Sequence, residues 1–493
     1  MSHLIILRER SGRGRAVLRL VLRGLAITAG LATTIEAQQT EVTAPARLEV
    51  TTASEIANQH FWAAIEEAQN IRFRTAASRL MSALELDPSF GMARALSGFV
   101  TPGLTTQERR AEIIRGLSEM GEATPAELLT AMAWREWVSG NTAQAKNLLD
   151  AAAALVPGDP NIAFYRAQIT SVTEGPEVGV SAFRSVIERF PDDAAAYNIL
   201  GYQLYRSGDK QGGMEMIRKY VSMLPDHPNS HDSYAEVLQW EGRFEQALEE
   251  YRRTLELDEE WIQGLTGQAE VLQMMGKGKD ARTKLTEAIA IAPTPQSRIN
   301  HHRAIANSFV RDGDRKAAVE HLEIAAREAA ENDIQNLETL ARQEMALYEG
   351  ALGKGSNIES HLSTASSAGA EGTIRQHAFA AVAYASAGMV SEAKEAASEL
   401  ERMAASAGSG WINTSRVANG MIGLAENNTS VAMEALTTAD PDDVLCRVLL
   451  AETYKRMGNR AEFDALRTDV LNDRRLSLFS ARQAIAYVRA KKL

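Results

Sequence analysis

The sequence predicts an all-α fold, a right-handed superhelical solenoid of tandem helix–turn–helix repeats. Two observations lead to this prediction. Prolines recur on a grid of 34 residues, at Pro157, Pro191, Pro225 and Pro293, and a period of this length is typical of stacked helix pairs. Helix-forming residues dominate the chain, aromatic residues are few, and no alternating pattern of useful length predicts strands.

Small residues repeat with the same period and explain how the two helices of a pair could cross closely. They fall at two points of each repeat: Ala133, Ala167, Gly201, Ala235 and Ala269, and then Ala145, Gly179, Gly213, Ala247 and Ala281. Large aliphatic side chains on either side would fill the remaining space. Gly208, Gly242 and Gly276 lie where the first helix of a pair must end, and such turns favour a positive φ.

The residues that carry this period resemble the tetratricopeptide repeat family. In the repeat that begins at Ala194, the matching residues are Tyr197, Leu200, Gly201, Leu204, Gly208, Gly213, Ile217 and Pro225. Consecutive repeats between residues 126 and 295 keep the same register. The resemblance implies a scaffold whose first helices line a concave groove for a protein or peptide.

The period loosens outside this array, and the chain divides into five predicted segments. They are a signal peptide (1–37), a polar linker expected to be mobile (38–54), a regular array (55–295), a degenerate array with longer helices (296–476) and a capping helix (477–493). The longer helices are expected at residues 316–330 and 334–350, where helix formers are nearly unbroken. The last helix should cover the apolar face that an unpaired repeat would expose.

The N-terminus has the layout of a secretory signal. Six arginines precede an apolar run from Gly24 to Ile35. Ala37, just after the run, completes a small-residue cleavage site. The run is too short for a confident membrane span, so we expect export to the periplasm or the extracellular space. An arginine-rich organellar transit peptide is the alternative, and a true start near Val17 or Leu20 would explain the long basic region.

The net charge of the chain and its lack of catalytic motifs disfavour several classes of partner and chemistry. The net charge is −11, and removal of residues 1–37 leaves about −15, which disfavours nucleic acid and anionic membranes as partners. The sole cysteine, Cys446, lies in an apolar segment and is expected to be a small buried residue. His227 and His231 are separated by Pro228 and make a poor metal site. Because no catalytic motif is present, we expect no catalysis, no cofactor and no metal.

The resemblance also implies a set of partner-binding residues. In the family, repeat positions 2, 5, 9 and 12 share one face of the first helix, distinct from its core face. Carried onto this chain, they give Trp134, Trp137, Phe164, Gln168, Asn198, Tyr202, Tyr205, Asp232, Glu236, Gln239, Glu270, Arg303 and Asn307. We expect the aromatic members to be exposed because the core positions of the same helices are already filled; the alternative is that preceding repeats cover them.

These residues favour one ligand chemistry and leave two functions open. Large aromatic side chains with acidic neighbours suit a peptide of apolar and basic character. No repeat carries the Lys and Asn pair with which the family's best-known groove binds a C-terminal carboxylate. The chain is then an exported scaffold, or it is an accessory or regulatory subunit of an envelope-associated enzyme complex. The partner and the oligomeric state stay open.

Overall fold

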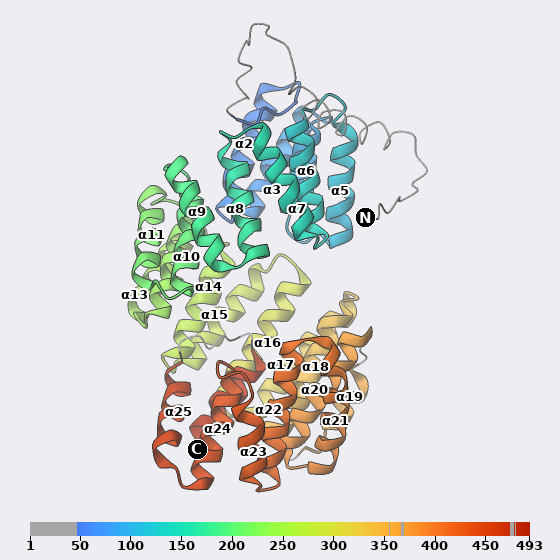
Figure 1. The fold of residues 1–493 in the computed structure, drawn as a ribbon, viewed down its shortest axis with the longest axis vertical. Coiled ribbons are helices and arrows are strands. Elements are labelled where there is room, and N and C mark those ends of the chain that lie inside the picture. Colours follow the sequence, from blue (N-terminus) through green and yellow to red (C-terminus); the bar gives the residue numbers. More distant parts are fainter. Residues whose placement is uncertain (1–46, 354, 366–368, 474–477, 479) are drawn as a thin grey trace, which may run out of the picture. The chain divides into compact units, whose positions relative to one another are not determined.

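The computed structural model describes residues 47–493, except 354, 366–368, 474–477 and 479. In that part the chain forms 25 α-helices, α2 to α26, and no strand (Figure 1). The predicted all-α repeat solenoid is thereby confirmed. No helix in the described residues is long and apolar enough to cross a membrane. The predicted signal peptide and residues 38–46 lie outside the described part.

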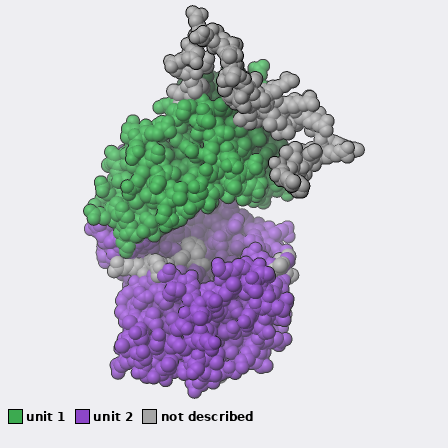
Figure 2. All heavy atoms as spheres, viewed as in Figure 1, with its two compact units in different colours: residues 1–223 green, residues 224–493 purple. Residues whose placement is uncertain are grey.

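The chain divides into two compact units, residues 1–223 and 224–493, which Figure 2 shows in separate colours. Unit 1 contains five helix pairs. They are α2 (Glu55–Gln69) with α3 (Phe73–Leu86), α4 (Gly91–Val100) with α5 (Thr106–Glu119), α6 (Pro125–Val138) with α7 (Thr142–Leu155), α8 (Pro160–Glu174) with α9 (Pro176–Arg189), and α10 (Ala194–Arg206) with α11 (Lys210–Met223). Their apolar side chains form one cluster that runs from Leu48 to Leu204.

Unit 2 continues the same arrangement. Its helices are α12 (Pro228–Trp240), α13 (Phe244–Leu257), α14 (Ile262–Met274), α15 (Gly278–Ile291), α16 (Pro295–Asp312), α17 (Arg315–Glu331), α18 (Gln335–Leu352), α19 (Ile358–Thr364), α20 (Gly369–Ala387), α21 (Val390–Ala407), α22 (Ser409–Ala425), α23 (Thr429–Thr437), α24 (Val444–Met457), α25 (Arg460–Asn472) and α26 (Ala481–Lys492). The long helices predicted near residues 316 and 334 are α17 and α18.

The small residues act as the sequence predicts. Gly208, Gly242 and Gly276 follow first helices with φ of 100°, 74° and 77°, conformations that residues with a Cβ rarely adopt. A Cβ added at Gly213 would lie 2.7 Å from the carbonyl oxygen of Gly201, so α10 and α11 cross with almost no side chain between them. The repeat period therefore sets the helix crossings directly.

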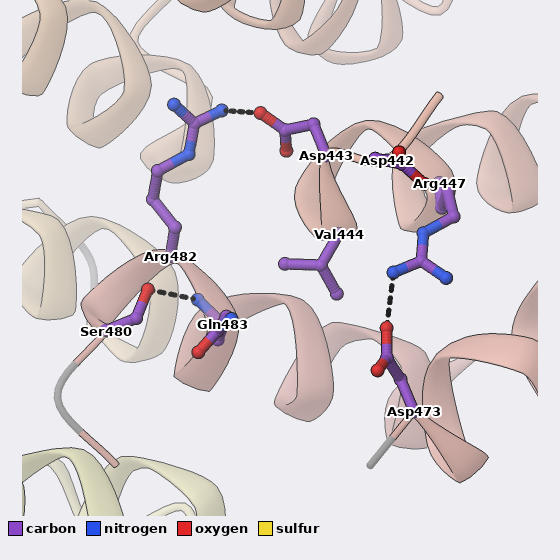
Figure 3. Close-up of a pocket in the computed structure, with 8 residues that line it drawn as sticks. All are labelled: Asp442, Asp443, Val444, Arg447, Asp473, Ser480, Arg482 and Gln483. Atoms are coloured by element: carbon purple, nitrogen blue, oxygen red, sulfur yellow. Dashed lines mark hydrogen bonds and ion pairs between the residues drawn. The ribbon is translucent and has the colours of Figure 1, made fainter. Parts of the chain in front are cut away.

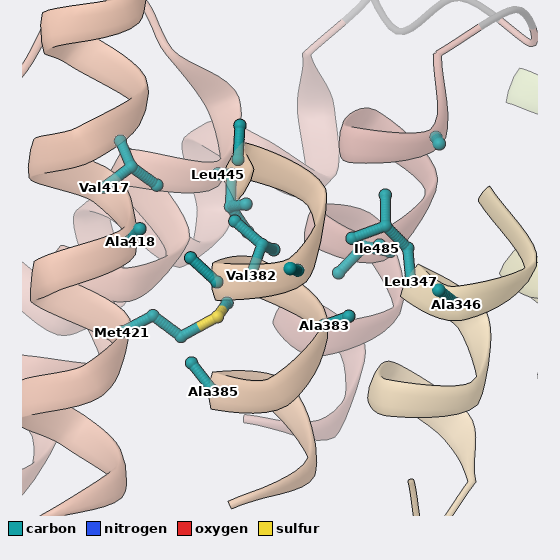
Figure 4. Packing of buried hydrophobic residues seen from close by; sticks show 14 of the residues in the cluster. Ala346, Leu347, Val382, Ala383, Ala385, Val417, Ala418, Met421, Leu445 and Ile485 are labelled. Atoms are coloured by element: carbon teal, nitrogen blue, oxygen red, sulfur yellow. The ribbon is translucent and has the colours of Figure 1, made fainter. Parts of the chain in front are cut away.

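The final helix does more than cover the last pair. α26 packs against α24 and α25, and also against α16 and α18, which are first helices much earlier in unit 2. Ile485 of α26 is fully buried and lies beside Leu347 of α18 in the apolar cluster drawn in Figure 4. The chain thus returns to the inner surface of unit 2 and fills part of it with its own C-terminal helix.

Candidate polypeptide-binding surfaces

The predicted site residues fall in both units, so each unit is described by itself. In unit 1, three of the five expected surface aromatics are buried: Trp134, Phe164 and Tyr205. Trp134 is only 1% exposed, and its ring stacks on Phe99 of α4 with 5.8 Å between centroids. The expectation of exposure is therefore wrong for these three, because side chains of neighbouring helices, including one from the preceding pair, cover them.

The other predicted residues of unit 1 offer little free surface. Trp137 and Tyr202 are half-buried, and Trp137 lies 5.6 Å from the ring of Phe99. Gln168 is half-buried as well. Asn198 is buried, and its Oδ1 has no hydrogen-bond partner among the described residues. These positions do not make the aromatic patch that the sequence predicts.

A different surface of unit 1 holds a stretch of polypeptide. Residues 47–54 run in an extended conformation over three successive pairs, and we name them the strap. The strap donates main-chain N–H groups to three buried carboxylates: Leu48 to Asp159 Oδ2 at 2.9 Å, Thr51 to Glu127 Oε1 at 2.6 Å, and Ala53 to Asp87 Oδ2 at 2.9 Å. The expectation of a mobile linker is therefore wrong for residues 47–54, since side chains fix their main chain.

Asp87 and Asp159 lie in turns that lead into the first helices α4 and α8, and Glu127 lies in the first turn of α6. Asp159 caps α8 through Oδ1, which accepts from Ile162 N at 2.8 Å, and so only Oδ2 is left for the strap. At Asp87, burial alone would raise the pKa, but hydrogen bonds from Ser89, Thr52 and Ala53 outweigh burial and lower the pKa to about 2. The strap therefore helps to keep a buried carboxylate charged.

In unit 2, the predicted residues of α14 and α16 meet another stretch of the chain, at Leu478. The side-chain amide of Asn307 donates to the carbonyl oxygen of Leu478 at 2.6 Å, and the N–H of Leu478 donates to the carboxylate of Glu270. Both main-chain polar groups of one residue are thus bound by side chains. The Leu478 side chain itself is 1% exposed and packs with Ala269, Leu285, Ala304 and Ile305.

Further side chains orient the two residues that hold Leu478. The hydroxyl of Tyr348 donates to Asn307 Oδ1, which fixes the Asn307 amide with its Nδ2 toward Leu478. Gln239 Nε2 donates to Glu270 Oε2 at 3.2 Å, and Tyr251 donates to Gln239 Oε1 at 3.2 Å. The pair is therefore set by a network that joins α12, α13, α14, α16 and α18.

Arg303 has a different role from the one expected. Its guanidinium group makes a two-bond ion pair with Glu344, at 2.8 Å and 2.7 Å, and both residues are buried. Such a pair holds α16 to α18 and occupies the group that a partner carboxylate would need. Arg303 therefore supports the surface and does not face a partner.

Two acidic residues of unit 2, Asp232 and Glu270, have raised pKa values. Burial, with a further contribution from Glu236, raises the pKa of Asp232 to about 8. The indole N–H of Trp261 opposes the shift, although its geometry is not that of a normal hydrogen bond. Burial and Glu236 also raise the pKa of Glu270, although Gln239, Arg311 and Leu478 oppose the shift. Burial and the repulsion between these carboxyl groups therefore favour their protonated forms.

A separate cavity of about 410 Å³ lies near the start of α26 (Figure 3). It is lined by Asp442, Asp443, Val444, Arg447, Asp473, Ser480, Arg482 and Gln483. Arg482 is paired with Asp443 at 2.7 Å and Arg447 with Asp473 at 2.5 Å, so each guanidinium group already faces a carboxylate. The cavity therefore provides a polar join between α24, α25 and α26 and gives no sign of an anion site.

The remaining chemical candidates have structural roles. Cys446 is buried as predicted, and burial raises the pKa of its thiol to about 12. His231 is engaged by Glu250 at 2.7 Å and by the carbonyl oxygen of Pro225 at 2.8 Å. No group of three or more His, Cys, Asp or Glu in the described ranges could hold a metal ion.

Sequence reasoning missed the strap, its three acceptors and Leu478. The repeat period does mark the turns in which Asp87 and Asp159 lie, and an acidic residue in such a turn is a usable signal. Leu478 has no comparable signal, because it lies outside the repeats and 171 residues from Asn307.

Comparison with known proteins agrees with the repeats. A family model described as tetratricopeptide repeat matches residues 174–228. Among curated proteins, none matches the chain significantly. Solved structures with some similarity include MamA from Desulfovibrio magneticus RS-1, at 17% identity over 35% of this chain and 96% of that one, with a TM-score of 0.30.

Two further structures are similar to this degree. PilW, a type IV pilus biogenesis factor, is 18% identical over 40% of this chain and 90% of its own, with a TM-score of 0.35. A tetratricopeptide repeat protein from Parabacteroides merdae is 12% identical over 58% and 99%, also with a TM-score of 0.35. At such values no conclusion about partners follows. The family-model match and the helix pairs around it show that the chain contains tetratricopeptide-type repeats.

Proposed function

We propose that the chain is an exported scaffold that binds a protein or peptide partner on its repeats and has no catalysis of its own. One observation carries the proposal. Side chains from α14 and α16, at positions predicted to line the groove, bind both main-chain polar groups of Leu478. A surface that binds both main-chain polar groups of one residue has the chemistry needed to hold a partner's main chain.

Charge supports a protein or peptide partner over nucleic acid. Lys and Arg number 53 against 64 Asp and Glu, and the surface around Leu478 carries Asp232, Glu236 and Glu270. A phosphate backbone would be repelled by such a surface, whereas a basic peptide would be attracted.

Co-purification from the native host tests the scaffold proposal. The tagged chain is compared with an Asn307→Ala variant, which removes the amide that donates to a bound main chain. We expect a defined partner with the parent chain and at least ten-fold less of it with the variant. A folded parent chain that brings down no partner above the untagged control would contradict the proposal.

Export rests on the sequence of residues 1–37 and has its own test. The proposal expects N-terminal sequencing of the mature protein from the cell envelope to begin close to residue 38. A cytosolic chain that still begins near Met1 would contradict export and leave the scaffold role unaffected.

A further inference from the structure

Leu478 occupies a site that is built like a peptide-recognition site. Its side chain enters an apolar socket formed by Ala269, Leu285, Ala304 and Ile305, and its main chain is held at the two edges by Glu270 and Asn307. We call these six residues the leucine site. Small residues at two of the socket positions leave room for one branched side chain between α14 and α16.

The two polar side chains of the leucine site are held by residues other than the occupant. Tyr348 fixes the Asn307 amide, and Gln239 fixes the Glu270 carboxylate at 3.2 Å. Such preorganisation lowers the entropy lost on binding and is what a recognition site needs. Ordinary core leucines of this chain, such as Leu285, lie within helices whose own hydrogen bonds satisfy their main chains.

Charge defines the rest of a suitable ligand. Glu270 lies at the edge of the socket, and Glu236 is close enough to raise the pKa of both Glu270 and Asp232. Burial and the negative charges of the same three carboxyl groups raise the pKa of Tyr251. A ligand with arginine or lysine next to its leucine would reduce this repulsion, and the sequence before Leu478 contains Arg474 and Arg475.

We infer that the leucine site recognises a short partner segment with a leucine preceded by basic residues, and that Leu478 of the same chain occupies the site when the partner is absent. The inference rests on the proposed function and specifies its ligand. Partner binding then requires exchange of one leucine for another, while α26 stays anchored through Arg489, which pairs with Glu452 at 2.7 Å.

The test uses the full chain and a labelled peptide with the sequence of residues 473–481. Fluorescence anisotropy measures its affinity for the parent chain and for Leu478→Ala, which vacates the socket. We expect at least ten-fold tighter binding to Leu478→Ala, and a loss of at least ten-fold when Asn307→Ala is added. A peptide with alanine in place of the leucine that corresponds to Leu478, and a scrambled peptide of equal charge, should bind at least ten-fold more weakly than the unaltered peptide.

Several results would overturn the inference. A folded Leu478→Ala chain that binds no peptide would do so. So would control peptides that bind as tightly as the unaltered peptide, since charge alone would then explain the affinity. A parent chain whose mass doubles in light scattering, and loses the doubling in Leu478→Ala, would assign the site to a second copy.

A measurement on the parent chain covers the case in which Leu478→Ala fails to fold. Excess peptide should speed hydrogen exchange at the Leu478 amide while α14 and α16 stay protected, and no change at Leu478 would overturn the inference. If the peptide fails while the native partner still depends on Asn307, the inference falls and the proposed scaffold stands. If the peptide binds and no partner is found, the scaffold proposal falls instead.

Discussion

In both units, side chains bind main-chain groups from another part of the same chain, but the pKa values of the carboxyl groups involved shift in opposite directions. In unit 1 the strap supplies hydrogen bonds to buried carboxylates, and the pKa of Asp87 falls to about 2. In unit 2, burial and repulsion from Glu236 raise the pKa of Asp232 to about 8. The difference indicates that hydrogen bonds from the strap favour a charged carboxylate in unit 1, whereas burial and repulsion between carboxyl groups favour the protonated form of Asp232 in unit 2.

The largest predicted effect concerns the core of unit 1. Trp134→Ala should lower the free energy of unfolding of unit 1 by about 3–5 kcal/mol, because it leaves a cavity beside Phe99. Trp137→Ala, a half-buried neighbour, is the matched control and should cost clearly less. Urea unfolding measures both. If the two variants lose the same small amount, Trp134 is not a core residue and the binding role first expected for it returns.

The second prediction concerns the independence of the units. A Cβ at Gly201 would lie 2.7 Å from Ile217 Cγ1, so Gly201→Leu should force α10 from α11 at a cost of about 1–3 kcal/mol or more. Gly121→Leu, where a Cβ meets nothing within 4 Å, is the control. Hydrogen exchange should rise in unit 1 and stay unchanged in unit 2. A uniform rise along the chain would show one cooperative core.

The third prediction uses the raised pKa of Asp232. An unfolded Asp ionises near 3.8 and the folded one near 8, so wild-type stability is fully present below pH 4 and falls as the pH rises towards 8. Asp232→Asn should therefore match the wild type at pH 4 and gain about 2 kcal/mol in the stability of unit 2 by pH 8. Asp226→Asn, an exposed control, should show no such trend. A constant difference at all pH values would contradict the raised pKa.

The fourth prediction also replaces an aspartate by asparagine, this time Asp87 in unit 1. Here the expected change in stability with pH has the opposite sign. Because the folded pKa of Asp87 is depressed, its stabilisation is present above pH 4 and is lost as the pH falls through 2. Asp87→Asn should cost about 1.5 kcal/mol at pH 7, since Asn cannot accept every bond from the strap and Ser89. The readout is amide exchange at residues 51–53, and the difference should vanish near pH 2. Unchanged exchange at pH 7 would show that the strap does not depend on Asp87.

What the sequence predicted and what it missed have a common explanation. The positive φ of Gly208 and the close crossing at Gly201 are local consequences of a 34-residue period and were predictable. The burial of Trp134 depends on Phe99, a residue of the preceding helix pair whose contact with Trp134 the period does not specify. The contacts of Leu48 and Leu478 join residues 111 and 171 positions apart, and no local pattern encodes such pairings.

The central claim, that the first helices of unit 2 bind a polypeptide partner, is tested most directly by photo-cross-linking in the native host. Benzoylphenylalanine replaces Thr266, one turn before Glu270 on α14, and in a matched variant it replaces Thr283 on α15. We expect a defined cross-linked partner from position 266 and none from position 283. Excess peptide with the sequence of residues 473–481 should abolish the cross-link from position 266. Cross-linking from position 283 alone, or equally from both, would contradict it.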